Sequence, residues 1–126
     1  MAATNAQAIK RNKMLYDSIE KRMKEFDEMA KASDLATAVN SIYSDKYKGI
    51  TPEGNTLVGT EAAAAYIAEN CQEMTAKIDE VNGDGEYAYC RGTFKTAKGG
   101  GKYITVWKRE ADEALHVYNE CWNYSK

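Results

Sequence analysis

Four side chains near the C-terminus have the types and spacing of a small acid–base site. His116, Tyr118, Glu120 and Trp122 alternate along a segment that is typical of a β-strand, and alternate residues of a strand share one face. A buried glutamate has a raised pKa, and with a tyrosine or a histidine beside it such a group can act as a general base. If this face is buried, Glu120 can serve as a general base near Tyr118 or His116.

A shift of this strand by one residue gives a second interpretation. Val117, Asn119 and Cys121 would then face inward, and the polar set would lie on a solvent-exposed or dimer-facing surface. In either register, the plainer interpretation is that His116 is an ordinary strand histidine and Glu120 an exposed or paired carboxylate, and it is favoured over a catalytic role.

The cysteines argue against a metal or redox centre. Cys71, Cys90 and Cys121 form no Cys-x-x-Cys pair, and the chain has a single histidine to complete a metal site. Each cysteine lies in a segment with a hydrophobic period, which predicts reduced, buried side chains that pack as small hydrophobes. We expect no metal site, and no motif in the sequence indicates a cofactor.

Composition narrows the classes of protein further. The chain has 126 residues, 44% of them hydrophobic and 29% charged, which predicts one globular domain spanning residues 1–126. Its 17 basic and 19 acidic residues give a formal net charge of -2, so there is no excess of positive charge for nucleic acid. No segment has the apolar length of a signal peptide or of a membrane span. These features predict a cytoplasmic protein with neither nucleic acid nor membrane as a partner.

Hydrophobic spacing predicts three helices followed by a sheet. Apolar residues recur every three or four positions, which is typical of amphipathic helices, over residues 6–31, 35–43 and 60–74. Short β-prone pieces around the only proline are expected at residues 47–51 and 55–58. An antiparallel meander with tight turns is expected from strands at residues 77–81, 86–95, 102–109 and 114–122. Helices first and sheet last predict an α+β fold with the helices packed on one face.

Six short segments, taken in order, resemble the nuclear-transport-factor-2-like (NTF2-like) superfamily, and most closely its SnoaL-like and ketosteroid-isomerase-like members. They are Ser33-Asp34-Leu35, Ile42-Tyr43-Ser44-Asp45, Val58-Gly59-Thr60-Glu61-Ala62, Gly92-Thr93-Phe94, Thr105-Val106-Trp107-Lys108-Arg109 and Trp122-Asn123. The resemblance covers nearly the whole chain. It implies a cone-shaped, cystatin-like α+β barrel, in which a curved antiparallel or mixed sheet carries three helices on its concave face and surrounds a pocket.

The same resemblance implies a homodimer and a ligand pocket. Dimers of this superfamily commonly form through the outer face of the sheet, and Tyr87, Tyr89 and Arg91 would form a suitable outer patch. The inner face would be aromatic with a few polar groups, which suits a flat or apolar small molecule. The side chains expected to contact this ligand are Phe26, Tyr43, Tyr103, Thr105, Trp107, Tyr118 and Trp122.

The chemistry of the ketosteroid isomerases is not expected to carry over. That reaction needs a carboxylate base, a tyrosine and a protonated aspartic acid. The resemblance places these roles on Thr51, Phe26 and Thr105, whose side chains cannot perform them. The Arg-x-Asp strand of the epoxide-hydrolase relatives is missing too, because Gly92 and Thr93 follow Arg91.

The sequence therefore favours a SnoaL-like domain that binds a small molecule and forms a homodimer. One alternative is an enzyme of the lyase, isomerase or cyclase type that uses Glu120 as its base. Another is a non-catalytic association module, like the one in calcium/calmodulin-dependent kinase, which shares the implied fold and a similar Val-Trp-x-Arg strand.

Overall fold

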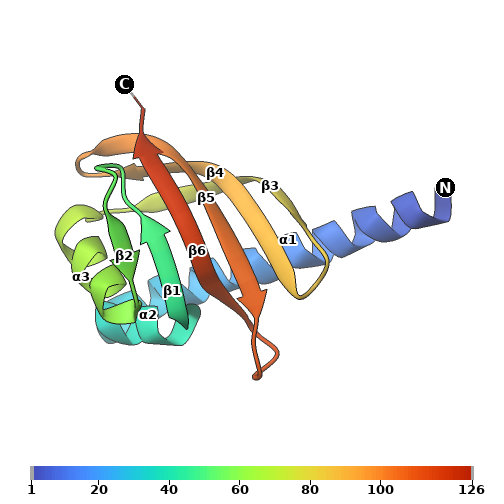
Figure 1. The fold of residues 1–126 in the computed structure, drawn as a ribbon, viewed down its shortest axis with the longest axis horizontal. Coiled ribbons are helices and arrows are strands. Elements are labelled where there is room, and N and C mark those ends of the chain that lie inside the picture. Colours follow the sequence, from blue (N-terminus) through green and yellow to red (C-terminus); the bar gives the residue numbers. More distant parts are fainter. Residues whose placement is uncertain (1, 126) are drawn as a thin grey trace.

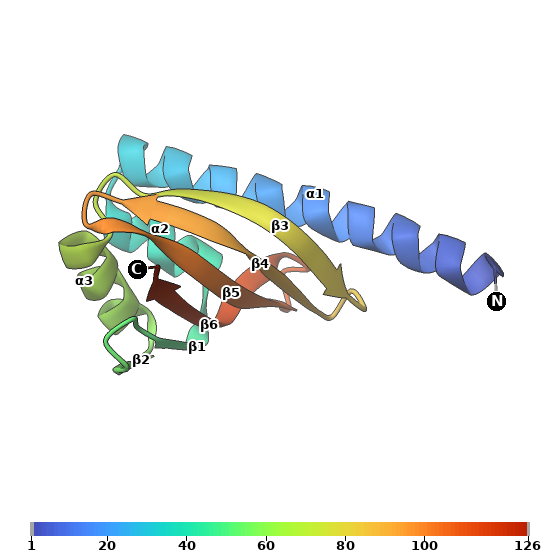
Figure 2. The same ribbon diagram turned by 90° about the horizontal axis from the view of Figure 1, so that it is seen from above.

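A long helix, α1 (Ala2–Ala32), opens the chain in the computed structural model, which describes residues 2–125 and their side chains from residue 6 onward (Figure 1). Leu15 and Ile19 are buried and Met23 and Phe26 are partly buried, so the apolar stripe expected from the sequence does face the core. The helix starts at Ala2, before the predicted start, and its first turns extend past the sheet (Figures 1 and 2).

Two shorter helices lie where the sequence predicts them, but they end earlier than predicted. Helix α2 (Leu35–Ile42) begins after Asp34, whose carboxylate accepts a hydrogen bond from the backbone N–H of Thr37 at 2.7 Å. Helix α3 (Thr60–Asn70) ends before Cys71, four residues short of the predicted end. The apolar residues beyond Asn70 do not continue the helix but lead into the next strand.

Six strands form one open, mixed sheet in the order β2-β1-β6-β5-β4-β3. Neighbouring strands are antiparallel except for β1 and β6, which are parallel. Among the described residues β2 and β3 remain the two edges, so the expected barrel is a curved sheet that does not close (Figure 2). The strands are β1 (Tyr43–Ile50), β2 (Thr56–Val58), β3 (Thr75–Gly83), β4 (Tyr87–Thr96), β5 (Gly99–Arg109) and β6 (Leu115–Tyr124).

The three helices cover one face of this sheet, which confirms the predicted α+β fold. Figure 1 shows α1 and α2 behind the strands, and the outer face of the sheet turned toward the viewer. The core between the layers is apolar because each element contributes its hydrophobic stripe or face. Its most deeply buried side chains include Ile19, Val39, Ile42, Tyr47, Ala63, Cys90 and Leu115.

Strand β1 starts four residues earlier than the sequence indicates, and this difference shapes the site. Tyr43 has an extended backbone (φ -89°, ψ 147°), and its N–H donates to the carbonyl of Val39 in the last turn of α2. The residue that closes the helix therefore also opens the strand, with no loop between them. As a result both Tyr43 and Tyr47 lie on β1 with buried side chains.

Candidate functional site

A cavity of about 620 Å³ lies between the helices and the concave face of the sheet. Most of its lining is apolar or aromatic, and the aromatic side chains come from α1 and four of the strands: Tyr16, Phe26, Tyr43, Phe94, Tyr103, Trp107 and Trp122. The exposed lining residues are Glu20, Lys24 and Asp27 of α1 and Ala76 and Lys77 of β3. The cavity therefore opens between α1 and the edge strand β3, and its other end lies deep in the protein.

Glu120 brings a carboxyl group to the deep end of this cavity. Its Oε1 accepts hydrogen bonds from the hydroxyls of Tyr47 at 2.8 Å and Tyr43 at 3.3 Å. Its Oε2 accepts one from the hydroxyl of Thr105 at 3.2 Å. Three strands meet here, because β6 carries Glu120 and its two neighbours, β1 and β5, supply the donors. The parallel pairing of β1 with β6 thus builds the polar centre of an otherwise apolar cavity.

Burial raises the pKa of Glu120 above its ordinary value of 4.5. The hydrogen bonds from Tyr47, Thr105 and Tyr43 act in the opposite direction, since they favour the ionised form, but the loss of solvent outweighs them. Glu120 is half-buried and is part of the cavity lining. Among the described residues, no lysine, arginine or histidine makes a hydrogen bond or ion pair with this carboxyl.

The two tyrosines act on Glu120 as neutral hydrogen-bond donors. Burial, followed by the nearby negative charge of Glu120, raises the pKa of Tyr43 and of Tyr47 well above the usual value of 10.0. Neither phenol therefore ionises at physiological pH. Gly49 makes room for the second of them, because a Cβ at this position would overlap the hydroxyl of Tyr47.

Two cysteines, which we call the cavity cysteines, also line the site. Cys71 and Cys90 are buried, and burial raises the pKa of each thiol to about 11. The indole N–H of Trp107 donates to the sulfur of Cys90 at 3.3 Å. Both groups are thiols at neutral pH and are poor nucleophiles. The prediction of buried cysteines is wrong for Cys121, which is exposed on the outer face of β6.

Six of the seven side chains expected to contact a ligand line this cavity. They are Phe26, Tyr43, Tyr103, Thr105, Trp107 and Trp122. The seventh, Tyr118, lies outside it, where its ring packs against Tyr87 with centroids 6.0 Å apart and lies 5.2 Å from the ammonium of Lys108.

The expected grouping of His116 and Tyr118 with Glu120 is wrong because β6 contains a bulge. Along the β5–β6 ladder Val106 pairs with Asn119 and Trp107 pairs with Val117, so Tyr118 is an extra residue without a partner. At the bulge the alternation of inward and outward side chains shifts by one residue. Val117, Glu120 and Trp122 point into the cavity, whereas His116 and Tyr118 do not line it.

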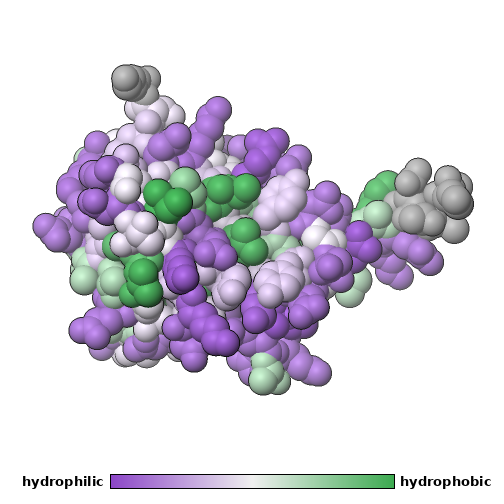
Figure 3. All heavy atoms as spheres, in the orientation of Figure 1, coloured by the Kyte–Doolittle hydropathy of each residue, from purple (hydrophilic) through white to green (hydrophobic). Residues whose placement is uncertain are grey.

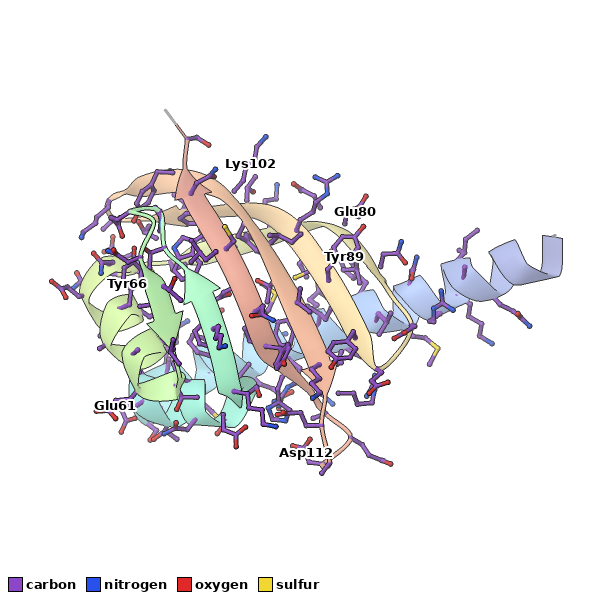
Figure 4. All side chains as sticks on the ribbon, in the orientation of Figure 1. Glu61, Tyr66, Glu80, Tyr89, Lys102 and Asp112 are labelled. Atoms are coloured by element: carbon purple, nitrogen blue, oxygen red, sulfur yellow. The ribbon has the colours of Figure 1, made fainter. Side chains whose placement is uncertain are left out.

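His116 instead belongs to a separate polar cluster at the β5–β6 turn. Its Nε2 lies 2.9 Å from Asp112, and its Nδ1 lies 3.7 Å from Glu110, which accepts a hydrogen bond from the hydroxyl of Ser44 at 3.0 Å. Figure 4 shows Asp112 at this turn, at the end of the sheet. Neither of the two registers considered from the sequence is correct along the whole strand, since each holds on one side of the bulge.

Tyr47 was not expected from the sequence to be a site residue. The segment from Tyr43 to Ile50 is rich in charged and polar residues, so it does not have the composition of a buried strand. The period of the strand was no guide either, because the pairing of β1 with β6 shifts register between Tyr43 and Lys48.

The positions that the resemblance assigned to isomerase chemistry lie in different places. Phe26 and Thr105 line the cavity, and Thr105 contacts Glu120. Thr51 is buried outside it, where its hydroxyl accepts a hydrogen bond from the backbone N–H of Asn55 at 3.1 Å. Within residues 2–125, no group of three or more histidine, cysteine or acidic side chains is placed to hold a metal ion. No described helix has the length and apolar character needed to cross a membrane.

Comparison with known proteins finds similar proteins through the structure alone. No protein-family model matches the sequence, and no curated protein matches it either. Solved structures do match. An NTF-2 like protein of unknown function from Shewanella oneidensis MR-1 superposes with a TM-score of 0.71 at 15% identity, over 86% of this chain and 98% of that one. The chain has the NTF2-like fold.

Other structures with the NTF2-like fold agree with this assignment. An NTF2-like superfamily protein from Salmonella enterica gives a TM-score of 0.67 at 13% identity, over 90% of this chain and 94% of that one. A ketosteroid isomerase-like protein from Erwinia carotovora atroseptica gives 0.64 at 18% identity, over 87% and 95%. At these identities the likeness establishes the fold, and function must be argued from the site.

Proposed function

We propose that this NTF2-like domain binds a small, mostly apolar molecule in the cavity between its helices and its sheet. The observation that carries the proposal is the carboxyl group of Glu120 at the deep end of a cavity of about 620 Å³ that is otherwise lined mainly by apolar and aromatic side chains. Ligand-binding cavities in proteins typically measure roughly 300–1,000 Å³ and combine apolar walls with a few placed polar groups. The carboxyl of Glu120 would fix the orientation of the ligand, and the aromatic walls would cover its body.

Binding of an uncharged fluorescent probe tests this function. N-phenyl-1-naphthylamine should become strongly fluorescent when it enters the cavity. Substitution of Ile78→Trp, on the half-buried cavity wall near the opening, should weaken that response by filling space. Ile9→Trp is the matched control, because Ile9 is 72% exposed on α1 and is not part of the lining. Equal fluorescence from the two variants, or none from the wild type, would contradict the proposal.

A second candidate function is acid–base catalysis by Glu120. The observation that favours it is the raised pKa of this carboxyl together with the neutral hydroxyl of Tyr43 beside it. Once ionised, such a carboxylate is a stronger base than an exposed one, and as it takes up a proton Tyr43 and Thr105 could turn their hydroxyls from it toward a developing oxyanion. Tyr118 and His116 have no part in this version.

Proton exchange in a flat ketone tests the catalytic candidate. When 2-tetralone is incubated with the protein in deuterated water, NMR should show faster exchange of its α-protons than in buffer. Glu120→Gln should abolish the acceleration because the amide is not a base. Exchange at the rate of the buffer with wild-type protein would remove this candidate for this class of substrate.

We further propose that the domain is a homodimer assembled through the outer face of its sheet. Ile50 pairs with Cys121 and Cys121 with Ile104, so the three form a row across β1, β6 and β5. Ile50 and Ile104 are 48% and 44% exposed. Figure 3 shows apolar side chains gathered over the middle of this face, with polar residues around them. Such an apolar centre with a polar rim is typical of a protein interface.

Part of the dimer patch expected from the sequence is already engaged within the chain. Glu80 accepts hydrogen bonds from the hydroxyl of Tyr89 at 2.6 Å and from the guanidinium of Arg91 at 3.1 Å. Figure 4 shows Tyr89 and Glu80 side by side on the outer face. The proposed centre of the interface is therefore the apolar row, and the Tyr89–Glu80–Arg91 group would form its rim.

Light scattering during size exclusion measures the oligomeric state. The wild type should elute with twice the mass of the 14.0 kDa chain. Ile104→Lys should elute as a monomer because it places a charge in the centre of the row. Ile9→Lys introduces the same charge far from the row and should remain a dimer. A wild-type monomer, or a dimer that persists in Ile104→Lys, would contradict the proposed assembly.

A further inference from the structure

We propose that the cavity selects ligands that carry a protonated amine on an apolar body. This assignment rests on the ligand-binding function proposed above and adds the chemical class of the ligand. Its basis is the carboxyl of Glu120, which lies at the deep end of the cavity without a cationic partner among the described residues.

The charges around the cavity are arranged to favour a cation at its deep end. Four charged residues lie at the opening, and they balance, since Glu20 and Asp27 are acidic and Lys24 and Lys77 are basic. All four are exposed to solvent, which screens them. Glu120 is the one acidic or basic side chain of the lining that lies away from this opening. An anionic ligand would therefore meet only a like charge there.

Glu120 also has hydrogen-bonding capacity left for a ligand. A carboxylate offers about four acceptor positions, and three hydroxyls occupy three of them. The less occupied atom is Oε2, which accepts from Thr105 alone. An ammonium group has only hydrogen-bond donors. It would therefore supply the missing hydrogen bond to this oxygen and also neutralise the buried negative charge.

The neighbouring aromatic rings would support a cation at this position. The centroid of the Tyr43 ring lies 5.9 Å from that of Phe26 and 4.9 Å from that of Tyr47. The Tyr43 hydroxyl itself contacts Glu120. Aromatic faces attract ammonium groups, and more strongly where water is excluded. The remaining walls, which include Ile42, Ile67 and Val117, suit the apolar body of an amine. The volume of about 620 Å³ accommodates a body of one or two rings.

Amine binding should depend on pH because Glu120 must ionise to form the pair. Burial raises the pKa of Glu120, so at acidic pH the incoming ammonium displaces a proton from the carboxyl to the buffer. The affinity for an amine should therefore rise as pH increases from 5 to 8. The other titratable groups that face Glu120 are Tyr43 and Tyr47 of β1, Tyr103 of β5 and the cavity cysteines, and all of them stay neutral over this range.

Three probes with similar bodies and different charges test the assignment. By calorimetry at pH 7.5, wild-type protein should bind 3-phenylpropylamine about tenfold more tightly than 3-phenyl-1-propanol, and 3-phenylpropanoate more weakly than either. Glu120→Gln keeps the shape of the side chain and should lose the preference for the amine. Glu28→Gln, which makes the same change at an exposed residue of α1 outside the cavity lining, should keep it.

The outcomes separate this assignment from the proposed function. If the alcohol binds as tightly as the amine, or if Glu120→Gln keeps the preference, the cavity binds ligands but does not select amines. If none of the three probes and no uncharged fluorescent probe binds, both proposals are overturned. Measurements of wild-type affinity between pH 5 and 8 do not depend on the folding of a variant. An amine affinity that does not increase over this range would contradict the role of Glu120.

Discussion

Removal of the hydroxyl of Tyr47 should destabilise the protein far more than removal of a similar hydroxyl at the surface. Tyr47 is 1% exposed, and its hydroxyl donates to Glu120 at 2.8 Å. Tyr66 donates to Glu53 at the same distance, 2.8 Å, but this pair lies at the surface. The two variants Tyr47→Phe and Tyr66→Phe therefore remove the same bond in two environments.

The structure sets the size of the expected difference. Loss of a hydrogen bond to a buried group costs about 1–3 kcal/mol, with the larger values for a charged acceptor. Exposed substitutions of this kind usually change stability by no more than about 0.5 kcal/mol. Tyr47→Phe should therefore lower the free energy of unfolding by about 1 kcal/mol where Glu120 is protonated and by up to about 3 kcal/mol where it is ionised. Tyr66→Phe should stay close to the wild type at every pH.

The sign of the pH dependence follows from the raised pKa of Glu120. The folded state holds this proton to higher pH than the unfolded state, whose carboxyl titrates near 4.5. The contribution of Glu120 to stability is thus fully present below that value and is lost as pH rises through the folded pKa, by at most about 1.4 kcal/mol per pH unit. Since the Tyr47 hydroxyl lowers the pKa of Glu120, its removal should extend the loss to higher pH.

Urea unfolding at several pH values between 4 and 8 measures this effect. The difference in unfolding free energy between Tyr47→Phe and the wild type should grow with pH, whereas in a Glu120→Gln background it should stay near about 1 kcal/mol at every pH, because the amide carbonyl still accepts the hydrogen bond and does not titrate. If Tyr47→Phe and Tyr66→Phe are equally stable, or if their difference is the same at every pH, the hydroxyl of Tyr47 does not act on a buried, titrating carboxyl.

Three further predictions use the same chain. Gly49→Ala should lower the free energy of unfolding in urea by about 1–3 kcal/mol, because its Cβ displaces the hydroxyl of Tyr47; an unchanged midpoint would show that the ring does not need this space. Asp34→Ala should cost about 1 kcal/mol through loss of the N-cap of α2, measured by thermal unfolding, whereas Asp34→Asn should restore most of it. Iodoacetamide at pH 8 should modify Cys121 readily in the folded Ile104→Lys monomer and slowly in the wild-type dimer, whose proposed interface covers it, while the two cavity cysteines should react only after denaturation, as mass spectrometry of peptides can determine.

The elements of the fold could be predicted from the sequence because each has a clear hydrophobic period. Leu15 and Ile19 in α1 follow the helical spacing, and the strands of the meander alternate between apolar and polar residues. Strand β1 was predicted only in part. Its first residues are Tyr43, Ser44 and two charged side chains, and its place in the sheet comes from pairing with β6 rather than from its own composition.

The candidate site could be predicted only where the period of the strand is unbroken. Glu120 and Trp122 were placed correctly because both follow the bulge in β6. The same period, extended backward, put Tyr118 and His116 on the wrong face. A bulge adds one residue to a strand without a reliable sequence mark, so periodicity is informative only between bulges. The partners of Glu120, 73 and 77 positions earlier in the chain, depend on a pairing that no local pattern records.

The position of β6 in the sheet has a consequence for how the protein reaches its native state. This strand is the last of the six to be synthesised, yet it lies between β1 and β5 near the middle of the sheet. Until β6 arrives, the hairpin of β1 and β2 and the hairpins of β3, β4 and β5 each present an unpaired edge that another chain could join. Folding of the domain must therefore finish after translation of β6, and slow release or truncation before Leu115 should favour aggregation over a partly folded monomer.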